Sequence, residues 1–380
     1  MKATKPFDVT SLPSLYTPDR RRIRVAEQRQ ADVFAGRKPD KWPLLIGGKR
    51  TAAQEKIPAP TIKEAFYDSD LMLCYGLRSA AASANTDSDV VPSIRANMGT
   101  GILMACLGLE QELFAENEMP WLKCHLTKAE IMKLTPGDIK IQGSFELGLR
   151  HMKRFREIMG DSIPVFCMDT QGPYDLAHLL LGDDLFLEMY DDPPFVHHLM
   201  DLVLALSIKA HTLMKEISGE PLNHVYHSNS YYGANMGIRI CEDTTVLIGE
   251  DAINTFAMPY TARLARHFGG AWIHYCGRND GLTRALCGIP EIRGINFGHV
   301  PGKVNDVGPE RFKKDMDLLH KSGKVYVGAW PLYPGESGKE YLDRIHKYAA
   351  IGAIIPVGNA ALGKNGFGSE DEALAYWHGL

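Results

Sequence analysis

Residues 236–276 read MGIRICEDTTVLIGEDAINTFAMPYTARLARHFGGAWIHYC. A short apolar run at 236–243 is followed by a helix-length amphipathic stretch at 250–268, and a second apolar run occupies 271–276. Two strands separated by a crossover of this length pair in parallel, because a tight turn would reverse the direction of the chain. The segment therefore predicts a strand–helix–strand unit of an α/β protein.

The same alternation extends in both directions along the chain. Short apolar runs occur at Pro43–Gly47, Asp89–Ala96, Ile163–Asp169, Met236–Asp243, Ala271–Cys276, Ile292–Phe297, Lys324–Trp330 and Ala353–Val357. Helix-compatible stretches separate them, such as 183–217, 309–322 and 339–351. Eight such units favour a closed (β/α)8 TIM barrel over an open doubly wound sheet, and no Gly-x-Gly-x-x-Gly of a dinucleotide-binding fold follows an early strand.

The expected domain organisation is simple. We predict a single (β/α)8 barrel over residues 41–380, preceded by an N-terminal helical extension over residues 1–40, in which 20–35 is helix-compatible. The long connection at 99–142 is expected to hold extra helices, and the polar, aromatic stretch at 224–235 a loop or a small hairpin.

The composition of the chain limits the kinds of partner that it is expected to bind. The 380 residues carry a net charge of -4, so the chain lacks the basic footprint of a nucleic-acid-binding protein. The longest apolar stretch, at 199–208, is short and interrupted by Asp201, which excludes an ordinary membrane-spanning helix. Seven scattered cysteines, an odd number, and an N-terminus without an apolar signal region predict reduced thiols and a cytoplasmic location.

In a TIM barrel, function collects where the strands end. Because strand side chains alternate, His274 and Cys276 share one face about 6–7 Å apart, and an imidazole with a thiolate forms half of a zinc site. Cys241 and Asp243 share the face of their strand opposite its isoleucines, and Asp169 ends the preceding strand. Purely structural roles remain open for these residues: Cys241 can be a packing residue, and Asp169 and Asp243 can be helix caps.

Several longer motifs resemble the uroporphyrinogen-decarboxylase superfamily. They are DTQGPYDLAHLLLG at 169–182, DDPPFVHHLM at 191–200, ICED at 240–243 with FAMPY at 256–260, and HYCG at 274–277. The resemblance covers roughly residues 20–380 and keeps the order of the landmarks. It implies a (β/α)8 barrel with the active site at its mouth.

Differences from the motifs of the superfamily indicate which of its branches the chain resembles. The Met-Arg-Gln-Ala-Gly-Arg-Tyr signature of true uroporphyrinogen decarboxylases is absent, since IGGKR stands at 46–50, and Leu179 lies where those enzymes carry a tyrosine. HYCG resembles the His-x-Cys-Gly of the zinc methyltransferases of the superfamily. That branch takes its third zinc ligand from a Gly-Cys-Gly after the last strand, where this chain has Asn359. The resemblance thus implies either a rebuilt zinc site on His274 and Cys276, completed by Cys241, Asp243, Glu242 or His299, or a mouth that binds no zinc.

The resemblance implies a methyltransferase that exchanges a methyl group between a corrinoid protein and a small methylated substrate, such as an aryl methyl ether, or a thiol acceptor. The cobalamin would be carried by a separate protein, because the chain has no Asp-x-His-x-x-Gly. The candidate catalytic residues are Asp243, Asp169 and Glu242, and the candidate metal ligands are His274, Cys276 and Cys241. The candidate substrate-binding residues are Arg95, Asn97, Tyr174, His227, Arg239, His299 and Trp330.

Two other classes of function stay open. A decarboxylase or other lyase would hold a carboxylated substrate with Arg95, Arg239 or Arg278. A non-catalytic barrel would bind its ligand or a corrinoid protein without turnover.

Overall fold

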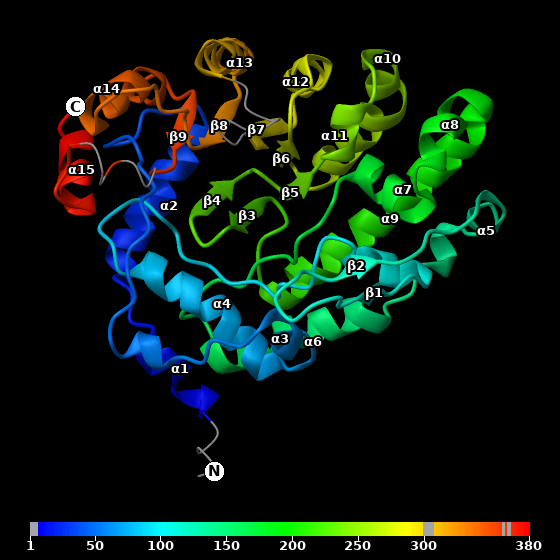
Figure 1. Cartoon of the computed structure of the whole chain (residues 1–380), viewed down its shortest axis with the longest axis horizontal. Helices are drawn as coiled ribbons and strands as arrows, with labels where there is room; N and C mark the ends of the chain where they lie inside the picture. Colours follow the sequence, from blue (N-terminus) through cyan, green and yellow to red (C-terminus); the bar gives the residue numbers. More distant parts are fainter. Residues whose placement is uncertain (1–6, 299–307, 359–361, 363–365) are drawn as a thin grey trace.

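The computed structural model describes residues 7–298, 308–358, 362 and 366–380. Its core is a parallel sheet of five consecutive strands, in which each strand pairs with the next along the chain (Figure 1). These strands are β5 (Ile238–Cys241), β6 (Ala271–Cys276), β7 (Ile292–Gly298), β8 (Val325–Gly328) and β9 (Ile354–Pro356).

Three shorter extended segments close the sheet into a ring. Parallel bridges join Leu45 to Val357, Ile94 to Val165 and Gln171 to Cys241, and the backbone N–H of Asp89 donates to the carbonyl of Leu44 at 3.1 Å. All eight predicted strand positions therefore lie in one closed barrel, which confirms the expected (β/α)8 fold. The first three pair only at single bridges, and each contains a proline (Pro43, Pro92, Pro164) that removes a donor from the ladder.

Helices surround the strands, as Figure 1 shows. The helices that follow the eight strand segments in turn are α4 (Ser69–Ala84), α6 (Gly143–Met159), α9 (Pro193–Ser218), α11 (Met258–His267), α12 (Asp280–Cys287), α13 (Pro309–Lys321), α14 (Gly338–Ala349) and α15 (Glu370–Trp377). They form because each presents one apolar stripe to the sheet. In α13, for example, the buried Phe312, Met316 and Leu319 recur at helical spacing.

Two connections differ from expectation. The stretch at 183–217 is two helices, α8 (Asp184–Asp191) and α9, because Pro193 cannot continue a helix and the Asp192 side chain caps the new one at Phe195 N. The connection at 99–142 holds less helix than predicted. It contains a 3-10 turn at Ile102–Leu107, a small hairpin of β1 (Gln111–Glu112) and β2 (Trp121–Leu122), and the single turn α5 (Lys128–Ile131).

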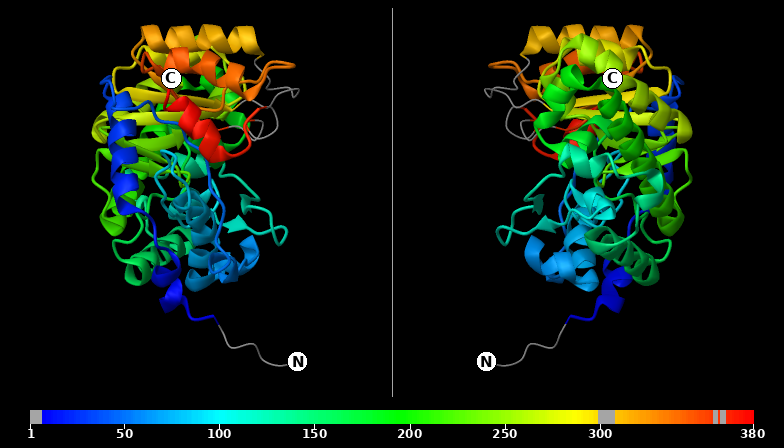
Figure 2. Two further views of the ribbon diagram at one scale, coloured as in Figure 1. Left: turned by 90° about the vertical axis from the view of Figure 1, so that its left-hand side faces the viewer. Right: turned by 90° about the vertical axis from the view of Figure 1, so that its right-hand side faces the viewer.

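The end of the barrel opposite the mouth is covered by α2 (Arg20–Phe34) and by a hairpin of β3 (His224–His227) and β4 (Tyr231–Ala234), where the sequence predicts a loop or small hairpin. The Gln30 side chain joins them, since its amide donates to Ser230 O at 2.9 Å and accepts from Tyr232 N at 2.9 Å. Figure 2 shows α2 on one side of the barrel, while β1–β2 projects from the other. The remaining helices are α1 (Leu12–Leu15), α3 (Ile62–Tyr67), α7 (Pro173–Leu181) and α10 (Glu250–Ala252).

Most of the buried apolar side chains lie between the barrel and its helices. A second, smaller core cluster includes Val90, Trp272, Val327 and Ile355 from the barrel strands and Val225 from the hairpin. No helix in the described part of the chain is long and apolar enough to cross a membrane.

Candidate metal and substrate site at the barrel mouth

Three potential metal ligands converge where β5 and β6 end. Sγ of Cys241, a carboxylate oxygen of Asp243 and a ring nitrogen of His274 all lie within 4.8 Å of one another. The sheet register produces this arrangement, because Cys241 pairs directly with His274 and Asp243 follows two residues later on the same face. The alternation predicted for β6 also holds, since Ile273 and Tyr275 are buried and the Tyr275 hydroxyl bonds Thr283 of α12.

The ring of His274 is held in one tautomer by Asn296 of β7. Asn296 Nδ2 donates to Val327 O at 2.5 Å, so its Oδ1 must accept from His274 Nδ1, also at 2.5 Å. The proton therefore sits on Nδ1, and Nε2 presents a lone pair to the neighbouring ligands. Burial, with help from the Arg239 charge, lowers the pKa of His274 and keeps the ring neutral. This is the state in which histidine binds metals.

Cys276 lies at the edge of the cluster. Its Sγ is 3.3 Å from His274 Nε2, and its backbone N–H donates to Asp243 Oδ1 at 2.5 Å. Burial and the Asp243 charge raise the pKa of the Cys276 thiol to about 11. Burial also raises the pKa of Cys241 well above its usual value, although Arg239 opposes the effect. Both side chains are therefore thiols at neutral pH, and a bound cation would be needed to hold them as thiolates.

The donor set suits zinc. Imidazole nitrogen, thiolate sulfur and carboxylate oxygen are its usual protein ligands, and bond lengths of about 2.0–2.3 Å keep them within roughly 4 Å of each other. The spacing of Cys241, Asp243 and His274 is close to this range, with Cys276 beside them. Asn359, where the resembling family has a cysteine, lies outside the described residues.

Two arginines hold Asp169 beside this cluster. Arg239 Nη1 lies 2.8 Å from Asp169 Oδ1, and Arg95 Nη2 lies 3.1 Å from Oδ2. Burial alone would raise the pKa of Asp169, but Arg95 and Arg239 outweigh burial and lower it, so the carboxylate stays ionised. Arg239 also lies over the Trp272 ring, 5.7 Å from its centroid.

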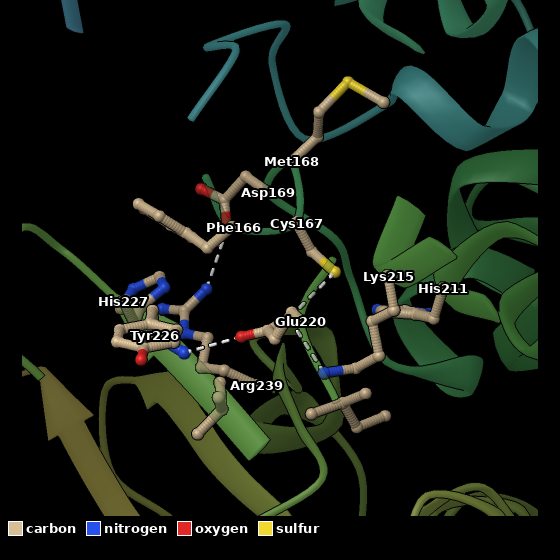
Figure 3. A pocket seen from close by; sticks show the side chains of 12 residues that line it. Phe166, Cys167, Met168, Asp169, His211, Lys215, Glu220, Tyr226, His227 and Arg239 are labelled. Carbon is tan, nitrogen blue, oxygen red and sulfur yellow. Dashed lines mark hydrogen bonds and ion pairs between the residues drawn. The ribbon is translucent and has the colours of Figure 1, made fainter. Parts of the chain in front are cut away.

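His227, the last residue of β3, lies beside Tyr226 and Arg239 (Figure 3). Its ring makes edge contacts with Phe166 and Trp272, at centroid distances of 5.6 and 5.2 Å. Burial, followed by the charges of Arg239 and Arg95, lowers the pKa of His227 well below its usual value. It therefore adds a neutral, polar wall to the interior of the barrel.

The structure places other candidates away from the cluster. Glu242 stands between Cys241 and Asp243, so alternation turns it to the helix side, where its carboxylate accepts from Thr261 and Thr245 at 2.6 and 3.0 Å. Burial raises the pKa of Glu242 to about 7.

Three aromatic or polar candidates also have other surroundings. Tyr174 is buried in α7, with its hydroxyl 3.4 Å from Met189 Sδ. Trp330 packs against Phe312 and Tyr348 of the outer helices. Asn97 remains near the mouth, 3.5 Å from Met119 Sδ, and His299 lies outside the described residues.

The sequence did not predict two residues that orient the members of this cluster. Asn296 faces the interior directly opposite His274 in the β6–β7 register, and alternation along 292–297 was the available signal. Asp175 of α7 accepts from the backbone N–H groups of Asp243 and Thr244 at 2.7 and 2.8 Å. It fixes the turn that aims Asp243 at the cluster, and no local pattern reveals such a contact.

No family model matches the sequence, and no curated protein matches it. Among solved structures, the chain is similar to a methyltransferase from Methanosarcina mazei, with a TM-score of 0.64 and 16% identity over 93% of this chain and 98% of that one. At this identity the likeness shows a shared fold over nearly the whole of both chains. It agrees with the closed barrel described above.

Proposed function

We propose that the chain is a methyltransferase that exchanges a methyl group between a small substrate and a corrinoid protein at the barrel mouth. The observation that carries the proposal is the convergence of Cys241, Asp243 and His274 on one point. A zinc ion held there would keep a thiol acceptor as its thiolate or polarise an ether oxygen so that its methyl group leaves. The likeness in fold to a methyltransferase supports the same reaction class.

The chain's own residues have separable tasks in this proposal. Cys241, Asp243 and His274 would hold the ion, and Asn296 orients the imidazole from behind. Cys276 is positioned to add a further ligand or to leave the cluster when substrate arrives. Arg239 spans the space between Asp169 and Cys241 and stabilises negative charge there.

Exposed apolar side chains support a protein partner at the mouth. Phe114 and Trp121 lie in and beside the β1–β2 hairpin, and Leu187 and Tyr190 lie on α8, each at least half exposed. Both segments follow barrel strands and so belong to the mouth side, and Lys128, just after β2, pairs with Glu188 of α8 at 2.6 Å. Large exposed aromatic side chains of this kind mark interaction surfaces. We propose that a corrinoid protein docks here and presents its cobalamin to the mouth.

The test is a methyl-transfer assay with free methylcobalamin as the surrogate donor and a small thiol as the acceptor, followed through the visible spectrum of the cobalamin. We expect turnover by the wild type and loss of turnover in Cys241→Ser and His274→Ala. Cys287→Ser, in a thiol at the end of α12, is the matched control and should leave the rate unchanged. Equal rates in all four proteins would contradict the proposal.

The arginine pair supports a second candidate, a lyase that acts on a carboxylated substrate. Arg95 and Arg239 together carry one more charge than Asp169 neutralises. Release of carbon dioxide from carboxylated aromatic substrates, without any requirement for cobalamin, would favour this activity over methyl transfer.

A further inference from the structure

A pocket of about 260 Å³ lies beside the Asp169 ion pairs. Tyr75 and Ser79 of α4 form one wall, Arg95 and Asn97 of the second strand segment form another, and Phe166 of the third lies next to them. The turn of the β3–β4 hairpin at 228–229 completes the lining. The volume suits a small molecule of about the size of a substituted aromatic ring.

Arg95 lines this pocket and has an unused donor. Its Nη2 is bonded to Asp169, but its Nη1 is buried and has no hydrogen-bond partner among the described residues. A buried N–H without a partner costs stability, more so on a charged group, so such a donor calls for an acceptor. The guanidinium also lies 5.8 Å from the centroid of Phe166, which leaves a flat apolar surface beside the charge.

The local charges favour an anion as that acceptor. Arg95 and Arg239 share the single carboxylate of Asp169, so the group has an excess of one positive charge. Asp243 lies among the candidate metal ligands and its charge acts on Arg239, whereas Arg95 is the arginine that lines the pocket. A carboxylate pairs with a guanidinium through strong charge-assisted hydrogen bonds, and a neutral ligand would leave the excess charge unpaired.

We infer that this pocket binds the carboxylate of the substrate, with Arg95 as its anchor, so that the substrate is a small, flat, carboxylate-bearing molecule. The side chains of Arg95, Asp169 and Arg239 form a continuous chain of ion pairs, and Arg239 interacts with Cys241 of the metal cluster. A molecule anchored at Arg95 therefore extends toward the mouth, where its reacting group meets the cluster. The part of this inference that concerns the reacting group rests on the proposed function, whereas the carboxylate site does not.

Calorimetric titration tests the site directly, with benzoate as the probe and benzamide as its neutral isostere. We expect the wild-type protein to bind benzoate, with at least a tenfold weaker affinity for benzamide. Arg95→Gln should weaken benzoate binding about 10- to 100-fold, the range for a lost charge-assisted bond. Arg95→Lys keeps the positive charge but loses the paired N–H donors of the guanidinium. Its affinity for benzoate should therefore lie between those of the wild type and Arg95→Gln. Arg263→Gln, in an exposed ion pair with Asp201, is the matched control and should bind as the wild type does.

Two further measurements decide between explanations. A thermal melt of Arg95→Gln that matches the wild type shows that weaker binding is not a loss of fold, and Arg95→Lys preserves the test if Arg95→Gln is unstable. His274→Ala should retain benzoate binding, because the anchor is Arg95 and not the metal cluster. Equal affinity for benzoate and benzamide, unchanged binding by Arg95→Gln, or loss of binding in His274→Ala would each overturn the inference. A protein that binds benzoate through Arg95 but fails in methyl transfer would keep this site and remove the proposed function.

Discussion

The two ends of the barrel both bury polar and charged side chains, but they treat them in opposite ways. At the hairpin end, Lys215 Nζ donates to Glu220 Oε2, Pro221 O and His224 O at 2.8, 3.4 and 2.6 Å, which uses all three of its protons. Glu220 also accepts from Tyr226 N at 2.8 Å. Figure 3 shows Lys215, Glu220 and Cys167 side by side, with the contacts of Glu220 to Lys215 and Cys167 drawn.

At the mouth end, the buried groups are only partly paired. Arg95 Nη1 and Arg239 Nε have no partner in the described part of the chain. His274 Nε2 lies 3.3 Å from Cys276 Sγ and the Asp243 carboxylate accepts from the Cys276 N–H, so each keeps capacity for a ligand beside Cys241. A fully paired network fastens one element to another, whereas convergent groups with unused capacity are suited to a ligand. We therefore expect the hairpin end to contribute mainly to stability and the mouth to bind a ligand.

The largest expected effect is on folding, at the hairpin end. Lys215→Met would leave Glu220 buried without its counter-ion, and breaking a buried pair in this way costs about 3–5 kcal/mol. Chemical denaturation should show this loss in the free energy of unfolding. A loss below about 1 kcal/mol would mean that the ion pair does not fasten the hairpin to α9.

At the mouth, Asp243→Asn should impair activity far more than folding. The amide is a poor ligand for zinc, so we expect methyl transfer to fall about 100-fold or more. The free energy of unfolding should change by less than about 1 kcal/mol, because Asn keeps an acceptor for the Cys276 N–H. Wild-type turnover by this variant, or a loss of stability alone, would make Asp243 a structural cap.

A smaller effect, on metal affinity, is expected from replacing Asn296, which bonds His274. Asn296→Ala removes the acceptor that fixes the His274 tautomer, and loss of such an outer contact typically weakens metal binding about tenfold or more. Zinc titration against a competing chelator measures the change. Unaltered affinity would show that the ring is held without Asn296.

The pH dependence of zinc affinity counts the thiolate ligands. Because the pKa of Cys276 is about 11 and that of Cys241 is also raised, each thiol must lose a proton to bind. His274 loses none, because its lowered pKa leaves it neutral until the pH falls below that value. The logarithm of the affinity should thus rise by about one per pH unit for each bound cysteine. A slope near two indicates both cysteines, a slope near one indicates a single cysteine, and a flat profile contradicts thiolate ligation.

Most of the fold could be predicted from the sequence, because the barrel depends on local periodicity. The eight apolar runs and their alternation with helices can be predicted from spacing, and His274 and Cys241 follow from alternation along their strands. The break at Pro193 and the scarcity of helix at 99–142 were not predicted. The side to which Glu242 points follows from the same rule once the strand register is known. Non-local contacts were not readable: the Asn296 bond to His274, the Asp175 bonds to the turn at Asp243 and the shared Asp169 all join segments distant in sequence.

We propose that the mouth holds a metal ion on Cys241, Asp243 and His274. Elemental analysis of protein purified without chelators or affinity-tag metals tests it directly, with the double variant Cys241→Ser/His274→Ala beside the wild type and Cys287→Ser as control. We predict close to one zinc per chain in the wild type and in the control, and close to none in the double variant. A metal-free wild type with full activity would contradict the account.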